Sequence, residues 1–487
     1  MDFRKLTVKE KALRVNLDPK IYGSFAEIGA GQETAANFFK AGGASGTIAK
    51  TMSAYDMAFS DAIYGAEASG RYVCEPRLMK MLNKEFDLLP MRLPDRAKST
   101  RFFAFANTVE AINFKRTNQG RGWLGVKFQL EPEGEPNECV IHVQMHDNEA
   151  VLQQQALGVI GVNLIYGCFF LAEEPEEFLL SLMDSLDRVR IEIDFFRLTG
   201  PSFNHVDNRL FSLKLVKHGM TDATMFDPAG NVQQPADILY KKNILMLRGR
   251  FRPPTHVNID MLESGLSQFK RDEEVDHNRL LVVTELTLHN LYKRGGNENS
   301  NIDEKDFLDR VDILCSMGMT VMISDYQEYF KLISFLSKFT RKRKIGIILG
   351  INNLLSIFDE KYYEFLRGGI LESFGTLFGR NVKMFVYPSL NEYTGELHTC
   401  KNAVLPSHLR HLFQYLVDND KIEDIEDCAQ ENLHIISDNV LAMIKNGEEG
   451  WELFLPEIVT KAIKENKLFN YNGEKASLPN DTMGLGG

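Results

Sequence analysis

The sequence lacks the long apolar stretch of a membrane span and the apolar core of an export signal. Its longest apolar run, Ala156 to Leu171, is 16 residues with Asn163 inside it, and a spanning helix needs about 20. The segment from Met1 to Lys5 leads into charged sequence, unlike a secretion signal. We therefore expect a cytoplasmic protein with no membrane segment.

Clustered cysteines and an excess of basic residues are also missing. Six cysteines are scattered without a close pair, so neither a zinc cluster nor a disulfide framework is predicted. The 56 basic residues are outnumbered by 67 acidic ones, giving a net charge of −11. Nucleic acid is therefore not an expected partner.

The common catalytic motifs are absent from the sequence. It contains no GxSxG, HExxH, GxxxxGK[ST] or CxxC, and no GxGxxG follows a predicted strand. These motifs carry nucleophile, metal and phosphate chemistry in known enzymes. The sequence motifs therefore indicate no particular reaction.

Short β-branched runs alternating with helical patterns fill the middle of the chain. Strand, helix, strand repetition predicts parallel strands joined by right-handed crossovers, hence an α/β fold. The core is either TIM-barrel-like, with seven or eight strands, or an open doubly wound sheet. The eighth strand depends on residues 149–171, which fit a helix or a buried strand. The seven runs are 189–196, 221–226, 243–247, 279–284, 319–324, 344–349 and 382–387.

The chain length of 487 residues predicts more than one domain. We expect an α+β domain over 1–156, the α/β core over 157–390, a helical subdomain over 391–470 and a disordered tail over 471–487. The first domain holds a glycine-rich segment and an antiparallel meander, because segments 101–115, 122–130 and 139–146 are strand-like and separated by turn residues.

Charged and amide side chains follow the predicted core strands. Ligands bind parallel α/β sheets at the carboxyl ends of their strands, so these side chains are the candidate site. For any single one of them, capping of the next helix or a structural ion pair is the favoured explanation, whereas for the set as a whole we expect at least some to line a functional pocket. The proposed metal ligands or acid and base are Asp194, Asp227, Glu285 and Asp325. The proposed anion-binding residues are Arg197, Arg248, Arg250, Arg252, His256, Asn352 and Asn353.

A glycine pair near the N-terminus is a second candidate. Gly29 and Gly31 follow a short apolar run and precede a helical pattern, as in loops that present amides to an anion. The segment resembles the first motif of S-adenosylmethionine-dependent methyltransferases, although Glu33 stands where a third glycine is expected. The alternative is that the glycines permit tight turns and close packing.

Several stretches resemble a family of long, uncharacterised bacterial proteins. The resemblance rests on EIGAGQETAANFFKAGGASGTIAKTMSAYD, GVNLIYG, VDNRLFSLKLV, ILYKKNIL and RGRFRP. Members carry two inconsistent labels, TonB-dependent receptor and nicotinate-nucleotide adenylyltransferase. The first implies an export signal and a many-stranded barrel, and the second an HxGH motif. This sequence has neither feature, so the resemblance assigns no residue a role.

The leading hypothesis is a cytosolic enzyme acting on a small, anionic, phosphorylated metabolite, with a divalent cation as a cofactor compatible with the carboxylates. The first alternative is a non-catalytic scaffold or ligand sensor that self-associates as a homo-oligomer. The second is a nucleotide- or S-adenosylmethionine-binding transferase that uses Gly29 and Gly31.

Overall fold

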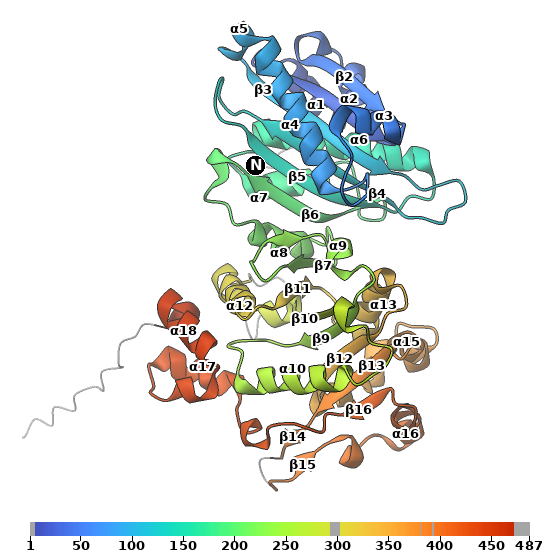
Figure 1. Cartoon of the computed structure of the whole chain (residues 1–487), viewed down its shortest axis with the longest axis vertical. Coiled ribbons are helices and arrows are strands. Elements are labelled where there is room, and N and C mark those ends of the chain that lie inside the picture. The colour runs from blue at the N-terminus through green and yellow to red at the C-terminus, as the bar shows by residue number, and fades with distance from the viewer. Residues whose placement is uncertain (1–4, 293–301, 380, 392–393, 472–487) are drawn as a thin grey trace, which may run out of the picture. The chain divides into compact units, whose positions relative to one another are not determined.

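The chain forms two compact units, Met1–Thr224 and Met225–Gly487, shown in Figure 1. This computed structural model describes residues 5–292, 302–379, 381–391 and 394–471. Each unit contains a sheet with parallel strands and covering helices, so the protein is α/β. The division falls at neither 156 nor 390, because a strand that we expected in the core joins the first sheet instead.

The first unit is built on a six-stranded sheet in the order β2-β1-β3-β4-β5-β6. β1 runs parallel to β2 and β3, and the other neighbours are antiparallel. The predicted meander is confirmed as β3, β4 and β5. The strands are β1 (Ile21–Gly29), β2 (Ile48–Ala54), β3 (Arg101–Glu110), β4 (Gly120–Phe128), β5 (Asn137–Met145) and β6 (Ile191–Thr199).

β6 corrects the expected membership of the core. Its apolar run was predicted as the first parallel core strand, yet it pairs antiparallel with β5, with a register shift between His142 and Val143. A short buried run has the same local pattern in either kind of sheet. Asp194 and Arg197 therefore belong to the first unit.

Helices cover both faces of the first sheet. Phe103 and Phe105 of β3 join the core beneath α6, whereas Phe102 and Ala104, which alternate with them, pack with Phe86 of α4. The segment 149–171, which fitted either a helix or a buried strand, forms the helix α6. The helices are α1 (Val8–Asn16), α2 (Glu33–Ala41), α3 (Met57–Tyr64), α4 (Glu75–Arg92), α5 (Pro94–Ala97), α6 (Ala150–Phe170), α7 (Pro175–Ser181) and α8 (Asn208–Lys217).

α6 is apolar on all sides because it is buried between the sheet and α1 and α2. It has 21 residues, but within the described ranges no helix is both long and apolar enough to cross a bilayer.

The second unit is built on an eight-stranded sheet in the order β16-β13-β12-β9-β10-β11-β7-β8. The pairings from β16 through to β11 are parallel, and β7 and β8 form an antiparallel pair. The sheet is open, with β16 and β8 at its edges, so the closed-barrel expectation is not met. The strands are β7 (Ala223–Phe226), β8 (Val232–Gln233), β9 (Asn243–Arg248), β10 (Leu280–Thr287), β11 (Thr320–Ser324), β12 (Ile345–Gly350), β13 (Val382–Tyr387) and β16 (Ile422–Asp424).

The helices of the second unit connect and flank these strands. Helix α10 contacts β9 and β12, α12 contacts β11, and α14 contacts β12 and β13. The helices are α9 (Pro235–Leu239), α10 (His256–Phe269), α11 (Leu288–Leu291), α12 (Glu304–Ser316), α13 (Tyr329–Thr340), α14 (Ile351–Ile357), α15 (Gly369–Leu377), α16 (Arg410–Asp418), α17 (Ser437–Asn446) and α18 (Glu457–Asn466).

The C-terminal region is only partly the helical subdomain that we expected. α17 and α18 share a small apolar core with Trp451 and with Ile313 of α12. However, β16 joins the main sheet, and β14 (Ser389–Leu390) pairs with β15 (Leu397–His398). Of the expected disordered tail, Tyr471 packs its ring 5.6 Å from that of Trp451, and residues 472–487 lie outside the described ranges.

Candidate functional site

A cavity of about 510 Å³ lies at the carboxyl ends of four neighbouring strands of the second unit. Residues 248–250 line it after β9, residues 287–290 after β10, residues 327–329 after β11 and residues 353–357 after β12. These loops meet because their strands run in the same direction.

The cavity lies where the strand order reverses. From β9 the chain proceeds to β10 and β11 on one side, then returns to β12 on the other side of β9 and continues to β13 and β16. The crossover from β9 leads to β10, whereas the crossover from its neighbour β12 leads to β13 in the opposite direction. The loops after these two strands therefore separate and open a crevice. The sheet therefore positions the cavity.

Arg248, the last residue of β9, is fixed by a buried ion pair. Its Nε and Nη2 donate to the carboxylate of Glu285 at 2.8 and 3.0 Å, and Nη1 donates to the Gln327 carbonyl at 2.8 Å. The Ser324 hydroxyl donates to Glu285 at 2.5 Å. Glu285 is 0% exposed, so it neutralises Arg248 from behind and is not part of the cavity lining.

Arg250 has a different environment. Its side chain is 36% exposed, lines the cavity and pairs with Asp438 through one nitrogen, Nη1, at 3.2 Å. Within the described part of the chain, its Nε and Nη2 have no acceptor. Arg250 is therefore the guanidinium best able to contact a ligand.

Two further arginines stand close behind Arg250. Arg310, only 2% exposed, donates to the backbone carbonyls of Arg250 and Asn290 at 3.2 and 2.9 Å. Asp306 pairs with both Arg310 and Arg252. With the Arg248–Glu285 and Arg250–Asp438 pairs, four guanidinium groups face three carboxylates. This group of side chains therefore carries one excess positive charge.

Three tyrosines form an aromatic side of the cavity. Tyr329 begins α13, and Tyr362 and Tyr363 lie on the short helix η4 (Glu360–Tyr363). The Arg248 guanidinium lies 4.3 Å from the centroid of the Tyr329 ring. Burial raises the pKa of the Tyr329 phenol, which the nearby Arg248 charge lowers only in part. The phenol is therefore a neutral group at neutral pH.

Of the predicted residues, Arg248, Arg250 and Asn353 line this cavity, and Glu285 supports it from behind. Asp227 instead holds a turn, accepting from the backbone of Ala229 and Asn231 at 2.9 Å. The remaining predicted residues of the second unit do not line the cavity either: Asp325, Arg252, His256 and Asn352.

Asp194 and Arg197 are corrections, since they lie on β6 of the first unit. Asp194 is 1% exposed and contacts Nδ1 of His142 at 2.5 Å, and it accepts from Gln144 Nε2 at 2.7 Å. Arg197 pairs with Glu75. Among the described residues no group of three or more histidine, cysteine or carboxylate side chains could hold a metal ion.

Gly29 and Gly31 serve close packing. A Cβ on Gly29 would lie 2.2 Å from the Val109 carbonyl oxygen, and one on Gly31 would lie 2.1 Å from Asn107 Oδ1. The start of α2 is already occupied by a carboxyl group of the chain, because Glu27 accepts from the Thr34 amide at 3.1 Å. These contacts leave no open amide cradle, so the packing alternative is favoured over a cofactor loop.

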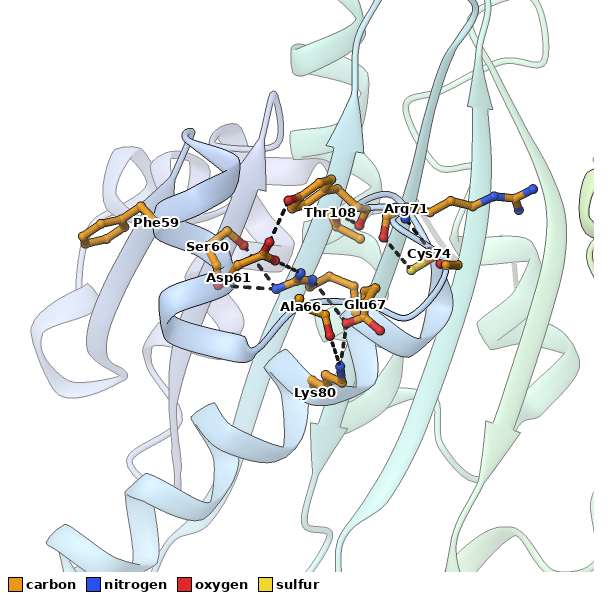
Figure 2. A network of polar contacts seen from close by, with 12 residues as sticks. Phe59, Ser60, Asp61, Ala66, Glu67, Arg71, Cys74, Lys80 and Thr108 are labelled. Atoms are coloured by element: carbon orange, nitrogen blue, oxygen red, sulfur yellow. Dashed lines mark hydrogen bonds and ion pairs between the residues drawn. The ribbon is translucent and has the colours of Figure 1, made fainter.

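A polar network in the first unit joins α3 and the following loop to α4. Figure 2 shows Asp61, Glu67 and Lys80 converging in it, with Phe59 directed away. Arg77, 1% exposed, pairs with Asp61 and lies 3.4 Å from Glu67, which Lys80 contacts at 3.0 Å. The positive and negative side chains of this network pair with one another, so we interpret the network as one that stabilises the packing of α3 and the following loop on α4.

Local sequence patterns carry little signal for several residues around the cavity. Tyr329 and Tyr362 lie in amphipathic segments, where aromatic residues usually indicate a core face. Arg310 lies within a helix, and only its depth of burial distinguishes it. His289, which also lines the cavity, follows a predicted strand by a few residues and was identifiable by that position alone.

No protein-family model and no curated protein matches the chain. Among solved structures, the competence/damage inducible protein CihA of Agrobacterium tumefaciens is 18% identical, with 37% of this chain and 99% of that chain covered and a TM-score of 0.24. A competence-damaged protein (CinA) superfamily member of Enterobacter cloacae is 12% identical, covering 37% and 96%, with a TM-score of 0.23.

A third similar structure, from Vibrio parahaemolyticus, is assigned provisionally as a nicotinate-nucleotide adenylyltransferase, which echoes one label of the resembled family. It is 14% identical over 48% of this chain and 99% of that chain, with a TM-score of 0.25. At these scores neither the neighbours' architecture nor their names are carried over to this chain.

Proposed function

We propose that the second unit binds a small, anionic, phosphorylated metabolite in the cavity at the ends of β9, β10, β11 and β12. The observation that carries this proposal is the coincidence of the cavity with the point where the strand order reverses. Open α/β sheets bind their ligands at this point because the diverging crossovers leave room there. The volume of about 510 Å³ lies within the usual range for small-molecule sites.

The charge of the ligand is inferred from the arginines. Arg250 offers its Nε and Nη2 at the cavity, and the surrounding ion pairs leave one positive charge in excess. A guanidinium binds a phosphate or carboxylate through two parallel hydrogen bonds. Arg248 contributes less directly, because Glu285 already accepts from two of its nitrogens.

Enzyme and ligand sensor are the two forms that this function can take. The four carboxylates predicted as catalytic do not line the cavity, whereas His289 does and is exposed there. An imidazole is the side chain best suited to proton transfer near neutral pH. Turnover of a bound ligand that is lost in His289→Gln, with binding kept, would establish the enzyme; binding without turnover would establish the sensor.

The binding proposal is tested by thermal unfolding of the full chain with a panel of phosphorylated metabolites, including ribose 5-phosphate, and with inorganic phosphate. A ligand at about 100 times its dissociation constant adds roughly 2.7 kcal/mol of stability. Arg250→Gln should weaken binding about 10- to 100-fold, since a hydrogen bond to a charged group contributes about 1.5–3 kcal/mol.

Arg279→Gln is the matched control for Arg250→Gln. Arg279 is also partly exposed and paired with a carboxylate, Asp276, at 3.6 Å, but it lies at the amino end of β10, at the opposite end of the strands. Its replacement should leave binding unchanged. Absence of any stabilisation across the panel, or equal losses in the two variants, would contradict the proposed site.

A further inference from the structure

The aromatic side of the cavity is built to present flat rings. Tyr363 is fixed by its hydroxyl, which donates to the Ile357 carbonyl at 2.7 Å, and its ring lies 6.2 Å from that of Phe330. Beside it, Tyr362 is 45% exposed although it is a large aromatic residue at a cavity. The Lys361 ammonium lies 4.8 Å from the centroid of the Tyr362 ring, and a ring at a cavity with nearly half its surface in solvent is suited to stacking on a ligand.

The anion-binding side limits the number of phosphates. In nucleotide-binding sheets, glycines after the first strand and the following helix present amides to a pyrophosphate. Here the loop after β9 carries Arg248 and Arg250, and a Cβ on Gly249 would lie 2.8 Å from the Phe251 ring. The helix α10 closes its own start, since Thr255 N donates to Asn258 Oδ1 at 3.0 Å. At the end of β9 the group offered to a phosphate is therefore the Arg250 guanidinium and not a cradle of backbone amides.

We propose that the ligand of this cavity is a nucleoside monophosphate, with its base stacked on Tyr362 beside Tyr329 and its phosphate on Arg250. This inference rests on the proposed function and adds the ring and the single phosphate to it. One excess positive charge suits one phosphate, and stacking on tyrosine tolerates any base.

Titration calorimetry of the full chain with AMP, GMP, CMP, UMP, ribose 5-phosphate and adenosine separates the two claims. At least one nucleotide should bind 10 or more times more tightly than ribose 5-phosphate, because only the nucleotide has a base to stack. Adenosine should bind more weakly than AMP, because it lacks the group that Arg250 contacts.

Variants of Tyr362 locate the ring. Tyr362→Ala should weaken the binding of the best nucleotide about 10-fold and leave ribose 5-phosphate unchanged, whereas Tyr362→Phe, which keeps the ring, should bind the nucleotide as the natural chain does. Because Tyr362 is exposed at 45%, its replacement leaves the core intact, and circular dichroism of each variant checks this.

The outcomes distinguish the inference from the function beneath it. If ribose 5-phosphate binds as tightly as every nucleotide, or if Tyr362→Ala has no effect, the base is not recognised and the inference is overturned while the anion site stands. If neither nucleotides nor ribose 5-phosphate bind, the proposed function fails and the inference with it. If adenosine binds as tightly as AMP, the phosphate contact at Arg250 is refuted.

Discussion

Arg248 and Glu285 form an ion pair in which both side chains are largely removed from water, with 9% and 0% exposure. Glu285→Gln should destabilise the protein by about 3–5 kcal/mol, because it leaves a buried guanidinium without its counter-charge. Urea unfolding measures this change. Asp427→Asn removes one of the two exposed carboxylates that pair with Arg271, the other being Glu426, and should cost less than about 1 kcal/mol. Equal effects of the two substitutions would refute the buried-pair argument.

Glu27 provides a pH-dependent test in the first unit. Burial raises its pKa to about 7, although hydrogen bonds from the backbone of Thr34 oppose the rise. The unfolded chain releases this proton near pH 4.3, so the folded state binds more protons between about pH 4.3 and 7. The free energy of unfolding should therefore fall through that range, by roughly 4 kcal/mol at most from this group.

Glu27→Gln should remove that fall, raising the melting temperature relative to the natural chain at pH 8 but not at pH 4. A glutamine keeps an oxygen that can accept from the Thr34 amide. Glu33→Gln replaces a more exposed carboxylate at the start of α2, the helix that contains Thr34. It should leave the difference in melting temperature between pH 4 and pH 8 as it is in the natural chain. A Glu27→Gln protein with unchanged pH dependence would show that Glu27 is not the group responsible.

At the scale of single residues, the sequence identified the basic segment at residues 248–252 but not the division of labour within it. Arg248, Arg250 and Arg252 are equivalent in a pattern of alternating arginines. Their separate carboxylates, Glu285, Asp438 and Asp306, are distant in the sequence, so only the fold shows that Arg250 has donors left for a ligand.

At the scale of elements, α6 packs against α2 through glycines. A Cβ on Gly161 would lie 2.3 Å from Thr34 Oγ1. Gly161→Ala should therefore destabilise the protein, because crowding of the core costs about 1–3 kcal/mol and outweighs the gain in helix propensity of about 1 kcal/mol. Thermal unfolding measures the net effect.

Gly375 of α15 supplies the control, since a Cβ there would meet nothing within 4 Å. Gly375→Ala should stabilise the protein by about 0.5–1 kcal/mol through helix propensity alone. Opposite signs for the two substitutions are expected, and a stabilising Gly161→Ala would contradict the close contact of the two helices.

Element by element, most strands of four or more residues were predicted, but β1 and β2 were not, and the pairing of the strands was not predictable. Six of the seven expected runs, from β7 to β13, lie in the second sheet, because each is a short buried β-branched run. β6 has the same pattern and joins the first sheet. β8, β14, β15 and β16 have only two or three residues each, too few for a periodic signal. α6 was ambiguous because burial on all sides removes helical periodicity.

At the scale of the whole molecule, the alternation of strand and helix patterns predicted an α/β fold and the chain length predicted more than one domain. The two sheets and the two compact units confirm this coarse picture. The strand order could not be predicted from local sequence patterns, because tertiary packing decides on which side of a strand the next strand is placed. A candidate site at the carboxyl ends of the core strands was predictable, because parallel α/β sheets bind ligands there. That the site lies at β9 and β12 could be known only from the order of the strands in the sheet.

Hydrogen exchange of the full chain, with and without a saturating phosphorylated ligand from the binding panel, tests the central claim most directly. Binding at the reversal point predicts slower amide exchange in residues 248–250, 287–290, 327–329 and 353–357, which lie far apart in the sequence and together line the cavity. At a ligand concentration equal to the dissociation constant of the natural chain, Arg250→Gln should lose most of this protection, because its binding is about 10- to 100-fold weaker. Protection confined to the first unit, or protection that persists in Arg250→Gln, would contradict the account.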